Sequence, residues 1–104
     1  MRGEPPAFEV ELPGARVVFS TRQGGVSAAP YDTLNLGILT GDQREAVSQN
    51  RIRLADRVGV PPECVAMGWQ VHGADLLEWD EPPASRFAEA DGDLARVDGH
   101  VTTC

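Results

Sequence analysis

The stretch DQREAVSQNRIRLADRVG, residues 42–59, decides the fold of this 104-residue chain. Its apolar residues recur at the spacing of one helical face: Val47, Leu54, Ala55 and Val58. Asp42 and Glu45 form the D-x-x-E pattern of a capping box at its start, and Gly59 stops the pattern. The sequence therefore predicts one well-defined helix near residues 43–58.

Asn50 lies close to the apolar face of this predicted helix. A buried side-chain amide must find hydrogen-bond partners. We therefore expect Asn50 to bond to a neighbouring loop.

Two short strands precede the helix. Apolar Phe8, Val10 and Leu12 alternate with acidic residues, which is typical of a half-buried strand. A Pro-Gly pair then leads into residues 16–20, so the pattern predicts an antiparallel hairpin. Residues 21–30 have neither period and are predicted to form an ordered loop.

Residues 64–72 are predicted to form a strand after the helix. Its core face would hold Val65, Met67, Trp69 and Val71. Its other face would hold Gln70 and His72 in a recess beside small residues. Gly73 predicts a turn into a hairpin partner at 75–79. Residues 80–98 read as a surface insertion with one helical turn near 85–90, and 99–103 as a short strand.

Charge and composition exclude some classes of partner. The net charge of −7 and pI of about 4.6 argue against binding nucleic acid or an acidic membrane surface. The chain length suits one domain, residues 1–104. Neither a signal peptide nor an apolar run of about 20 residues is apparent, and the two cysteines make no disulfide framework, so we expect a cytoplasmic protein.

His72 is the leading candidate for chemistry, because a neutral imidazole binds zinc or copper and titrates near neutral pH. A catalytic zinc site, however, takes three protein ligands. Taken alone, His72 is better explained as a hydrogen-bonded structural residue, and His100 has a weaker claim still.

Arg22 is the second candidate. It stands before Gly24-Gly25 and among hydroxyl side chains, where a guanidinium can grip an oxyanion such as phosphate. The spacing is not that of a P-loop. A salt bridge that pins the loop explains the same residues equally well.

Three segments agree in order and spacing with one family: FSTRQGGVS at 19–27, YDTLNLG at 31–37 and QVHG at 70–73. Together with Gly41-Asp42 and Asn50-Arg51, they resemble the YfiH family, also described as the multicopper polyphenol oxidoreductase or laccase-like family. The resemblance runs from about residue 15 to residue 103.

The resemblance implies a purine nucleoside phosphorylase that cleaves adenosine, inosine, guanosine and methylthioadenosine with phosphate and also deaminates adenosine. His72 would be catalytic and a metal ligand, usually of zinc, with copper as the alternative. Arg22 and Asn35 would bind substrate. The family's other two ligands, a Cys after Ala-Asp and a His before Gly-Trp-Arg-Gly, have no counterpart here, since Cys104 follows Thr-Thr.

The fold implied is α+β, part of a layered α-β-β-α sandwich with a mixed or antiparallel sheet. The chain then reads as the N-terminal portion of a longer domain, inactive alone, with strand edges open to self-association. Two other functions stay open: a copper-dependent polyphenol oxidase of the same family, and a truncated, non-catalytic binding module.

Overall fold

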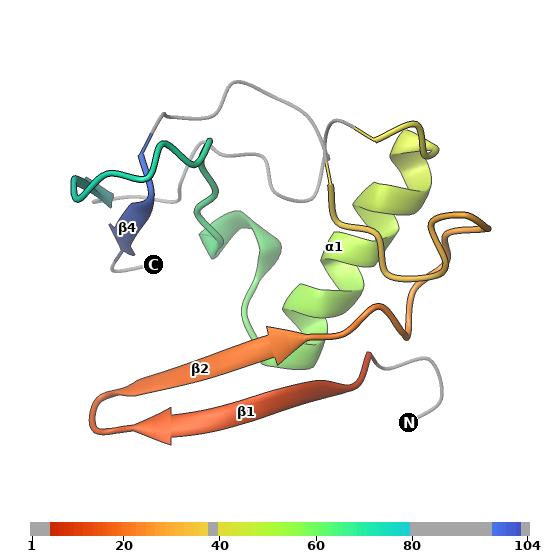
Figure 1. The fold of residues 1–104 in the computed structure, drawn as a ribbon. Coiled ribbons are helices and arrows are strands. Elements are labelled where there is room, and N and C mark those ends of the chain that lie inside the picture. Colours follow the sequence, from red (N-terminus) through yellow and green to blue (C-terminus); the bar gives the residue numbers. More distant parts are fainter. Residues whose placement is uncertain (1–4, 38–39, 80–96, 103–104) are drawn as a thin grey trace.

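A computed structural model describes residues 5–37, 40–79 and 97–102. The elements follow in the order β1 (Ala7–Leu12), β2 (Ala15–Ser20), α1 (Arg44–Val58), the 3₁₀ turn η1 (Pro62–Cys64), β3 (Leu76–Trp79) and β4 (Gly99–Thr102). Figure 1 shows α1 rising from the β1–β2 hairpin, with β4 to the left of the helix. In the described residues the fold is α+β, with one helix and two small sheets.

The predicted antiparallel hairpin is confirmed. Its apolar face, which was expected to be half-buried, is exposed. β1 and β2 are antiparallel, and Phe8 stands opposite Phe19 while Val10 stands opposite Val17. Residues directly opposite share one face of a sheet, so these side chains form one apolar face. That face points away from α1, and Phe8 and Phe19 are 69% and 57% exposed.

The opposite face of the hairpin holds the end of the helix. Arg16 lies in this face and donates to the Val58 carbonyl at 3.0 Å, which satisfies one of the last carbonyls of α1. Glu9 accepts hydrogen bonds from Arg16 at 2.6 Å and Arg57 at 3.3 Å. These ion pairs hold the pKa of Glu9 below its ordinary value, chiefly through the Arg16 hydrogen bond.

The helix is confirmed at both of its ends, but the capping box is wrong. Gln43 is the N-cap and makes no side-chain capping bond. The Asp42 carboxylate instead accepts from Ser27 and Asn35, so it is committed to the loop. Gly59 ends α1 at φ 84°, a left-handed conformation that suits glycine, and its N–H donates to the Ala55 carbonyl.

The core lies between α1 and the loop that follows β2. Leu34, Val47 and Ala55 are its most buried apolar residues. Polar side chains share this core, because Asn50 is fully buried and Arg51 is 1% exposed. Arg51 donates through Nε and an Nη to the Leu36 carbonyl at 3.1 and 2.7 Å.

The predicted strand at 64–72 is wrong. Cys64 ends η1, Gly68 makes an isolated bridge, and the rest of the stretch is irregular. The Pro61-Pro62 pair sets the 3₁₀ turn, and His72 at φ 56° breaks an extended ladder. The supposed core face is half-buried at Trp69 and exposed at Val71, and Gln70 and His72 on the other face are exposed as well.

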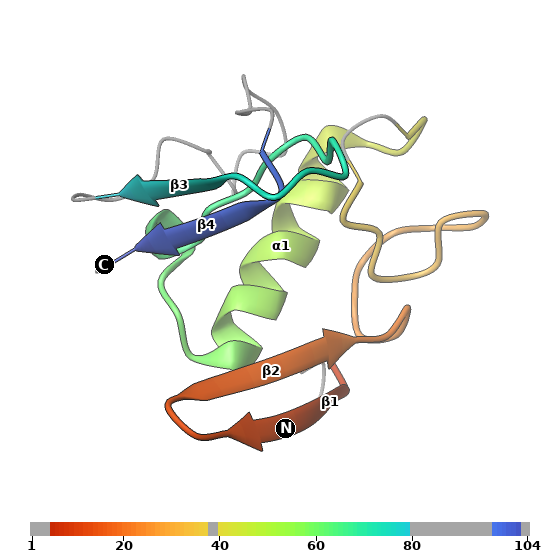
Figure 2. The same ribbon diagram turned by 60° about the vertical axis from the view of Figure 1, so that its left-hand side comes forward.

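The expected second hairpin is also wrong, because β3 pairs in parallel with β4. Leu76 stands opposite Gly99 and Trp79 opposite Thr102. Figure 2 shows the two strands side by side above α1. The described strands thus form one antiparallel and one parallel pair, and not a single mixed sheet.

Three further expectations concern the cysteines, the segment near residues 85–90 and a membrane span. Cys64 is disulfide-bonded, which the sequence analysis did not predict. The predicted turn near 85–90 lies outside the described residues. Within those residues, no helix is long and apolar enough to cross a membrane.

Candidate functional site

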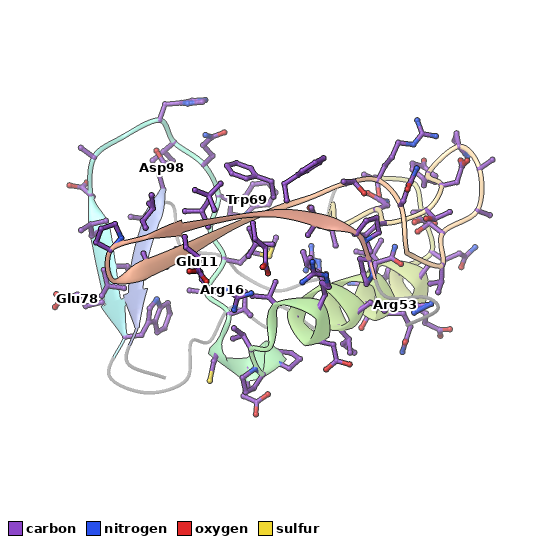
Figure 3. All side chains as sticks on the ribbon, turned by 90° about the horizontal axis from the view of Figure 1, so that it is seen from below. Glu11, Arg16, Arg53, Trp69, Glu78 and Asp98 are labelled. Carbon is purple, nitrogen blue, oxygen red and sulfur yellow. The ribbon has the colours of Figure 1, made fainter. Side chains whose placement is uncertain are left out.

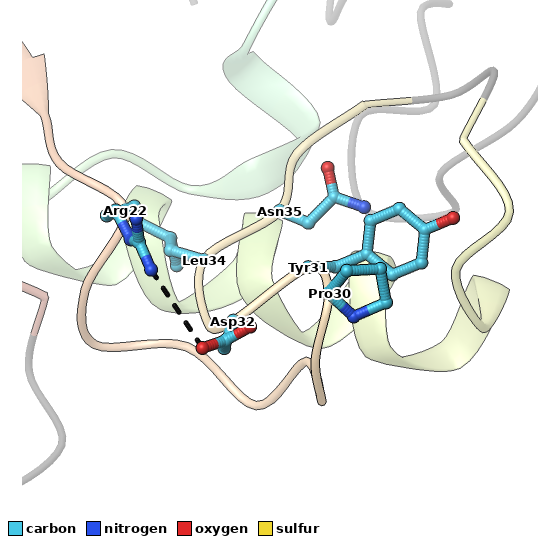
Figure 4. Close-up of a pocket in the computed structure, with 6 residues that line it drawn as sticks. All are labelled: Arg22, Pro30, Tyr31, Asp32, Leu34 and Asn35. Atoms are coloured by element: carbon cyan, nitrogen blue, oxygen red, sulfur yellow. Dashed lines mark ion pairs between the residues drawn. The ribbon is translucent and has the colours of Figure 1, made fainter.

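A pocket of about 260 Å³ opens in the segment between β2 and α1. Six residues line it: Arg22, Pro30, Tyr31, Asp32, Leu34 and Asn35. Figure 4 shows these side chains coming from the two arms of the loop. The structure therefore brings together the two residues predicted to bind substrate, Arg22 and Asn35.

Backbone hydrogen bonds close the loop around this pocket. The Arg22 carbonyl accepts from the N–H groups of Thr33 and Leu34, both at 2.8 Å. Ser27 N–H donates to the Thr33 carbonyl at 2.9 Å. The loop predicted at 21–30 is thus ordered, and its two arms are tied together at the pocket.

Asn50 ties the same loop to the helix, as predicted. Its Oδ1 accepts from Val26 N–H at 2.8 Å. Its Nδ2 donates to Ser27 Oγ at 2.8 Å and to the Asn35 carbonyl at 2.9 Å. A fully buried amide with these partners fixes the pocket walls against α1.

The glycines beside Arg22 serve packing rather than flexibility. A Cβ on Gly25 would collide with the Thr33 carbonyl and stand 2.5 Å from Asn50 Oδ1. Gly24 has φ 94°, and a Cβ there would collide with Pro5. Gly24 and Gly25 therefore allow the close packing of this loop against Pro5, Thr33 and Asn50.

Arg22 itself extends from this arm into solvent. Its side chain is 81% exposed and lies 3.9 Å from the Asp32 carboxylate. An exposed ion pair at that separation contributes little to stability. The loop is pinned by the Arg22 carbonyl instead, and the guanidinium lies exposed beside the Asp32 carboxylate at the pocket.

Asn35 is held by bonds on both ends of its amide. Nδ2 donates to Thr40 Oγ1 at 2.9 Å and to the Asp42 carboxylate at 3.2 Å, and Oδ1 accepts from Gly37 N–H at 3.1 Å. Ser27 Oγ donates to the same carboxylate at 2.5 Å. The hydrogen bond from Ser27 is the main reason that the pKa of Asp42 is lowered. Asp42 thereby positions Asn35, a role that the sequence did not reveal because the D-x-x-E pattern pointed to capping.

His72 does not line this pocket. It lies in the exposed turn before β3, and among the described residues it is the one non-glycine with positive φ. The N–H groups of Val71 and Gly73 both donate to Asp98, which the sequence analysis treated as the end of an insertion. The structure therefore does not unite His72 with Arg22.

The fit of the chain to a metal centre is incomplete. No group of three His, Cys, Asp or Glu side chains able to hold a metal occurs in the ranges 5–37, 40–79 and 97–102. His100 lies in β4, where its Nδ1 accepts from Trp79 Nε1 at 3.1 Å. The residues described here do not make a zinc or copper site, and His72 offers one ligand at most.

Comparisons with known proteins show which proteins this chain resembles. A family model described as multi-copper polyphenol oxidoreductase laccase matches residues 16–104. A protein of Corynebacterium glutamicum named purine nucleoside phosphorylase is 48% identical over 85% of this chain. A Mycobacterium tuberculosis protein of the same name is 46% identical over 88% of it.

A solved structure has a similar fold in a longer chain. The crystal structure of YlmD from Geobacillus stearothermophilus superposes with a TM-score of 0.63 at 36% identity, over 80% of this chain and 31% of that one. The matched segments cover 34% and 35% of the two relatives. This chain therefore spans about a third of the length of the proteins it matches.

Proposed function

This chain belongs to the multi-copper polyphenol oxidoreductase laccase family, and we propose that it supplies part of an enzyme that splits purine nucleosides with phosphate. The relatives named purine nucleoside phosphorylase, at 46–48% identity, support this reaction. The substrates proposed are adenosine, inosine, guanosine and methylthioadenosine. Deamination of adenosine is proposed as a second activity.

One observation carries the proposal furthest: an exposed guanidinium, Arg22, on a loop that is otherwise rigid. In phosphorolysis a phosphate oxygen bonds to C1′ of the ribose while the bond from C1′ to the purine breaks, and the base leaves with a proton. An oriented phosphate lowers the barrier to this step. Arg22 would bind and orient the phosphate through its forked N–H groups.

Asn35 and Tyr31 would shape the nucleoside side of the pocket. Tyr31 Oη accepts from Gly41 N–H at 3.1 Å, which keeps the ring in the pocket wall. Both the nitrogen and the oxygen of the Asn35 amide already have partners in the loop. Asn35 would therefore act mainly as a fixed part of the pocket wall, with the second lone pair of Oδ1 left to accept a hydrogen bond from the nucleoside. These walls exclude water from one side of a bound ligand.

His72 is proposed as the ligand that this chain contributes to a metal, zinc or alternatively copper. Such an ion polarises an oxygen or activates a bound water. The described residues do not complete its coordination.

A chimera tests the proposed function. Residues 16–104 would replace the matching segment of the Corynebacterium glutamicum relative, and purine release from inosine would be measured with and without phosphate. We expect phosphate-dependent release, and an Arg22→Gln chimera with a phosphate KM at least tenfold higher and a less affected kcat. Arg44→Gln, which removes an exposed charge from α1, is the matched control. An Arg22→Gln chimera with unchanged phosphate KM would remove Arg22 from the site.

Oxidation of polyphenols by copper is the second candidate, since the description of the matching family names that chemistry. The same chimera would then consume oxygen with a phenolic substrate and copper. Oxygen consumption without purine release would replace phosphorolysis by oxidation. A chimera that folds but shows neither purine release nor oxygen consumption would favour a non-catalytic module.

A further inference from the structure

The turn that carries His72 has a backbone that needs support. His72 has φ 56°, in the left-handed region that side chains with a Cβ rarely adopt. The turn is exposed, and no regular element contains it. A non-glycine residue keeps such a conformation only where its surroundings impose it.

Asp98 provides that support. Its Oδ1 accepts from Val71 N–H and its Oδ2 from Gly73 N–H, each at 2.5 Å. The two donors belong to the residues before and after His72, so the carboxylate of Asp98 bonds to the backbone on both sides of His72. Successive N–H groups around a left-handed residue form a concave anion site, and here a carboxylate of the chain fills it.

The parallel ladder of β3 and β4 explains how Asp98 reaches the turn. Leu76 pairs with Gly99, so Asp98 precedes β4 at the level where the chain enters β3. Figure 3 shows the labelled Asp98 beside the segment that leads into β3. The pairing thus delivers the carboxylate from a residue 25 positions away from Gly73.

We propose that Asp98 is the positioning residue for His72. By holding the two flanking amides it fixes φ at His72, and φ sets the direction in which the imidazole leaves the backbone. The task of that imidazole rests on the proposed function, whereas the clamp itself is a property of this chain. Any ligand that uses His72 then meets a preorganised side chain.

Substitution of Asp98 tests the clamp by NMR on the 104-residue chain. Asp98→Asn keeps the size of the side chain but replaces one acceptor oxygen by a donor. We expect amide exchange at Val71 and Gly73 to accelerate at least tenfold, and the one-bond Cα–Hα coupling of His72 to move from its positive-φ value. Asp75→Asn, an exposed carboxylate near the same turn, should leave both unchanged.

A second variant covers local loss of structure. Protection at Leu77 reports whether β3 still pairs with β4. His72→Gly in the Asp98→Asn background should leave exchange at Gly73 fast, because glycine removes the steric penalty of the positive φ but supplies no acceptor for this amide. Unchanged exchange and coupling in Asp98→Asn, or slow exchange at Gly73 in the double variant, would overturn the proposal.

The clamp and the proposed function fail separately. Zinc affinity of the Corynebacterium glutamicum chimera, in which the relative supplies the rest of the protein, reports the task of the imidazole. A His72→Ala chimera that binds zinc as tightly as the parent chimera would contradict the metal role and leave the clamp standing. A loosened turn in the Asp98→Asn chain with an unaltered zinc affinity of the Asp98→Asn chimera would support the clamp but contradict its positioning of the ligand.

Discussion

Replacing Asn50 by alanine should destabilise the loop that forms the Arg22 pocket. Asn50 is fully buried and makes three hydrogen bonds, to Val26 N–H, Ser27 Oγ and the Asn35 carbonyl. Each such bond contributes about 1 kcal/mol net, and a buried partner left without one costs about 1–3 kcal/mol.

The surroundings of the three partners narrow the expected loss of stability. Ser27 Oγ keeps its bond to Asp42 after the substitution, so it is not left alone. Val26 is 48% exposed, so water can reach part of its backbone. We therefore expect the free energy of unfolding to fall by about 2–4 kcal/mol, a large share of the stability of a small domain.

Chemical denaturation measures this loss, and amide exchange at Val26 locates it. Gln49→Ala is the matched control, because it removes an exposed amide from the next position of the same helix. A free energy of unfolding for Asn50→Ala within about 0.5 kcal/mol of the Gln49→Ala value would refute the role given to Asn50.

Other substitutions test the loop, the two faces of the hairpin and the buried side of α1. Gly25→Ala should lower the free energy of unfolding by about 1–3 kcal/mol, because its Cβ meets the Thr33 carbonyl; a neutral effect in urea denaturation would contradict the packing. Val47→Ala, at a buried position, should cost about 2 kcal/mol, whereas Phe19→Ser on the exposed hairpin face should cost less than about 1 kcal/mol. The reverse order of these two losses would show that the hairpin is turned the other way. Asp42, whose pKa lies below its ordinary value of 3.8 owing first to Ser27, should add stability above that pH and lose it as pH falls through the lower folded value. The urea midpoint of the parent should therefore fall more steeply in acid than that of Asp42→Asn, and parallel pH profiles would count against the Asp42–Ser27 bond.

Local patterns predicted the elements that depend on nearby residues. The hairpin follows from alternation around a Pro-Gly turn, and the helix from one apolar face ending at Gly59. Asn50 was predicted to bond to a loop, because a buried amide requires partners wherever they lie. These inferences needed no knowledge of distant contacts.

Pairing between distant segments escaped prediction. The alternation at 64–72 resembled a strand, but β3 found its partner in β4, more than 20 residues further along the chain. The same distance hid Asp98, whose contact with the turn at His72 exists only because of that parallel pairing. Asp42 was misread because a capping pattern and a loop anchor look identical in sequence.

The structure places two of the three predicted site residues together. Arg22 and Asn35 line one pocket, although they lie 13 positions apart in a loop without periodicity. His72 stands outside this pocket, and the chain matches only about a third of the length of its relatives. The roles of all three residues stay predictions.

Titration of the 104-residue chain with inorganic phosphate tests most directly whether the Arg22 pocket recognises the co-substrate. The readouts are the Arg22 Nε–Hε resonance and the amides of Leu34 and Asn35, at constant ionic strength set with chloride. We predict saturable shifts at these groups that disappear in Arg22→Gln and persist in Arg44→Gln. Shifts that are absent, or equal in the Arg22→Gln chain, would contradict a phosphate site at this pocket.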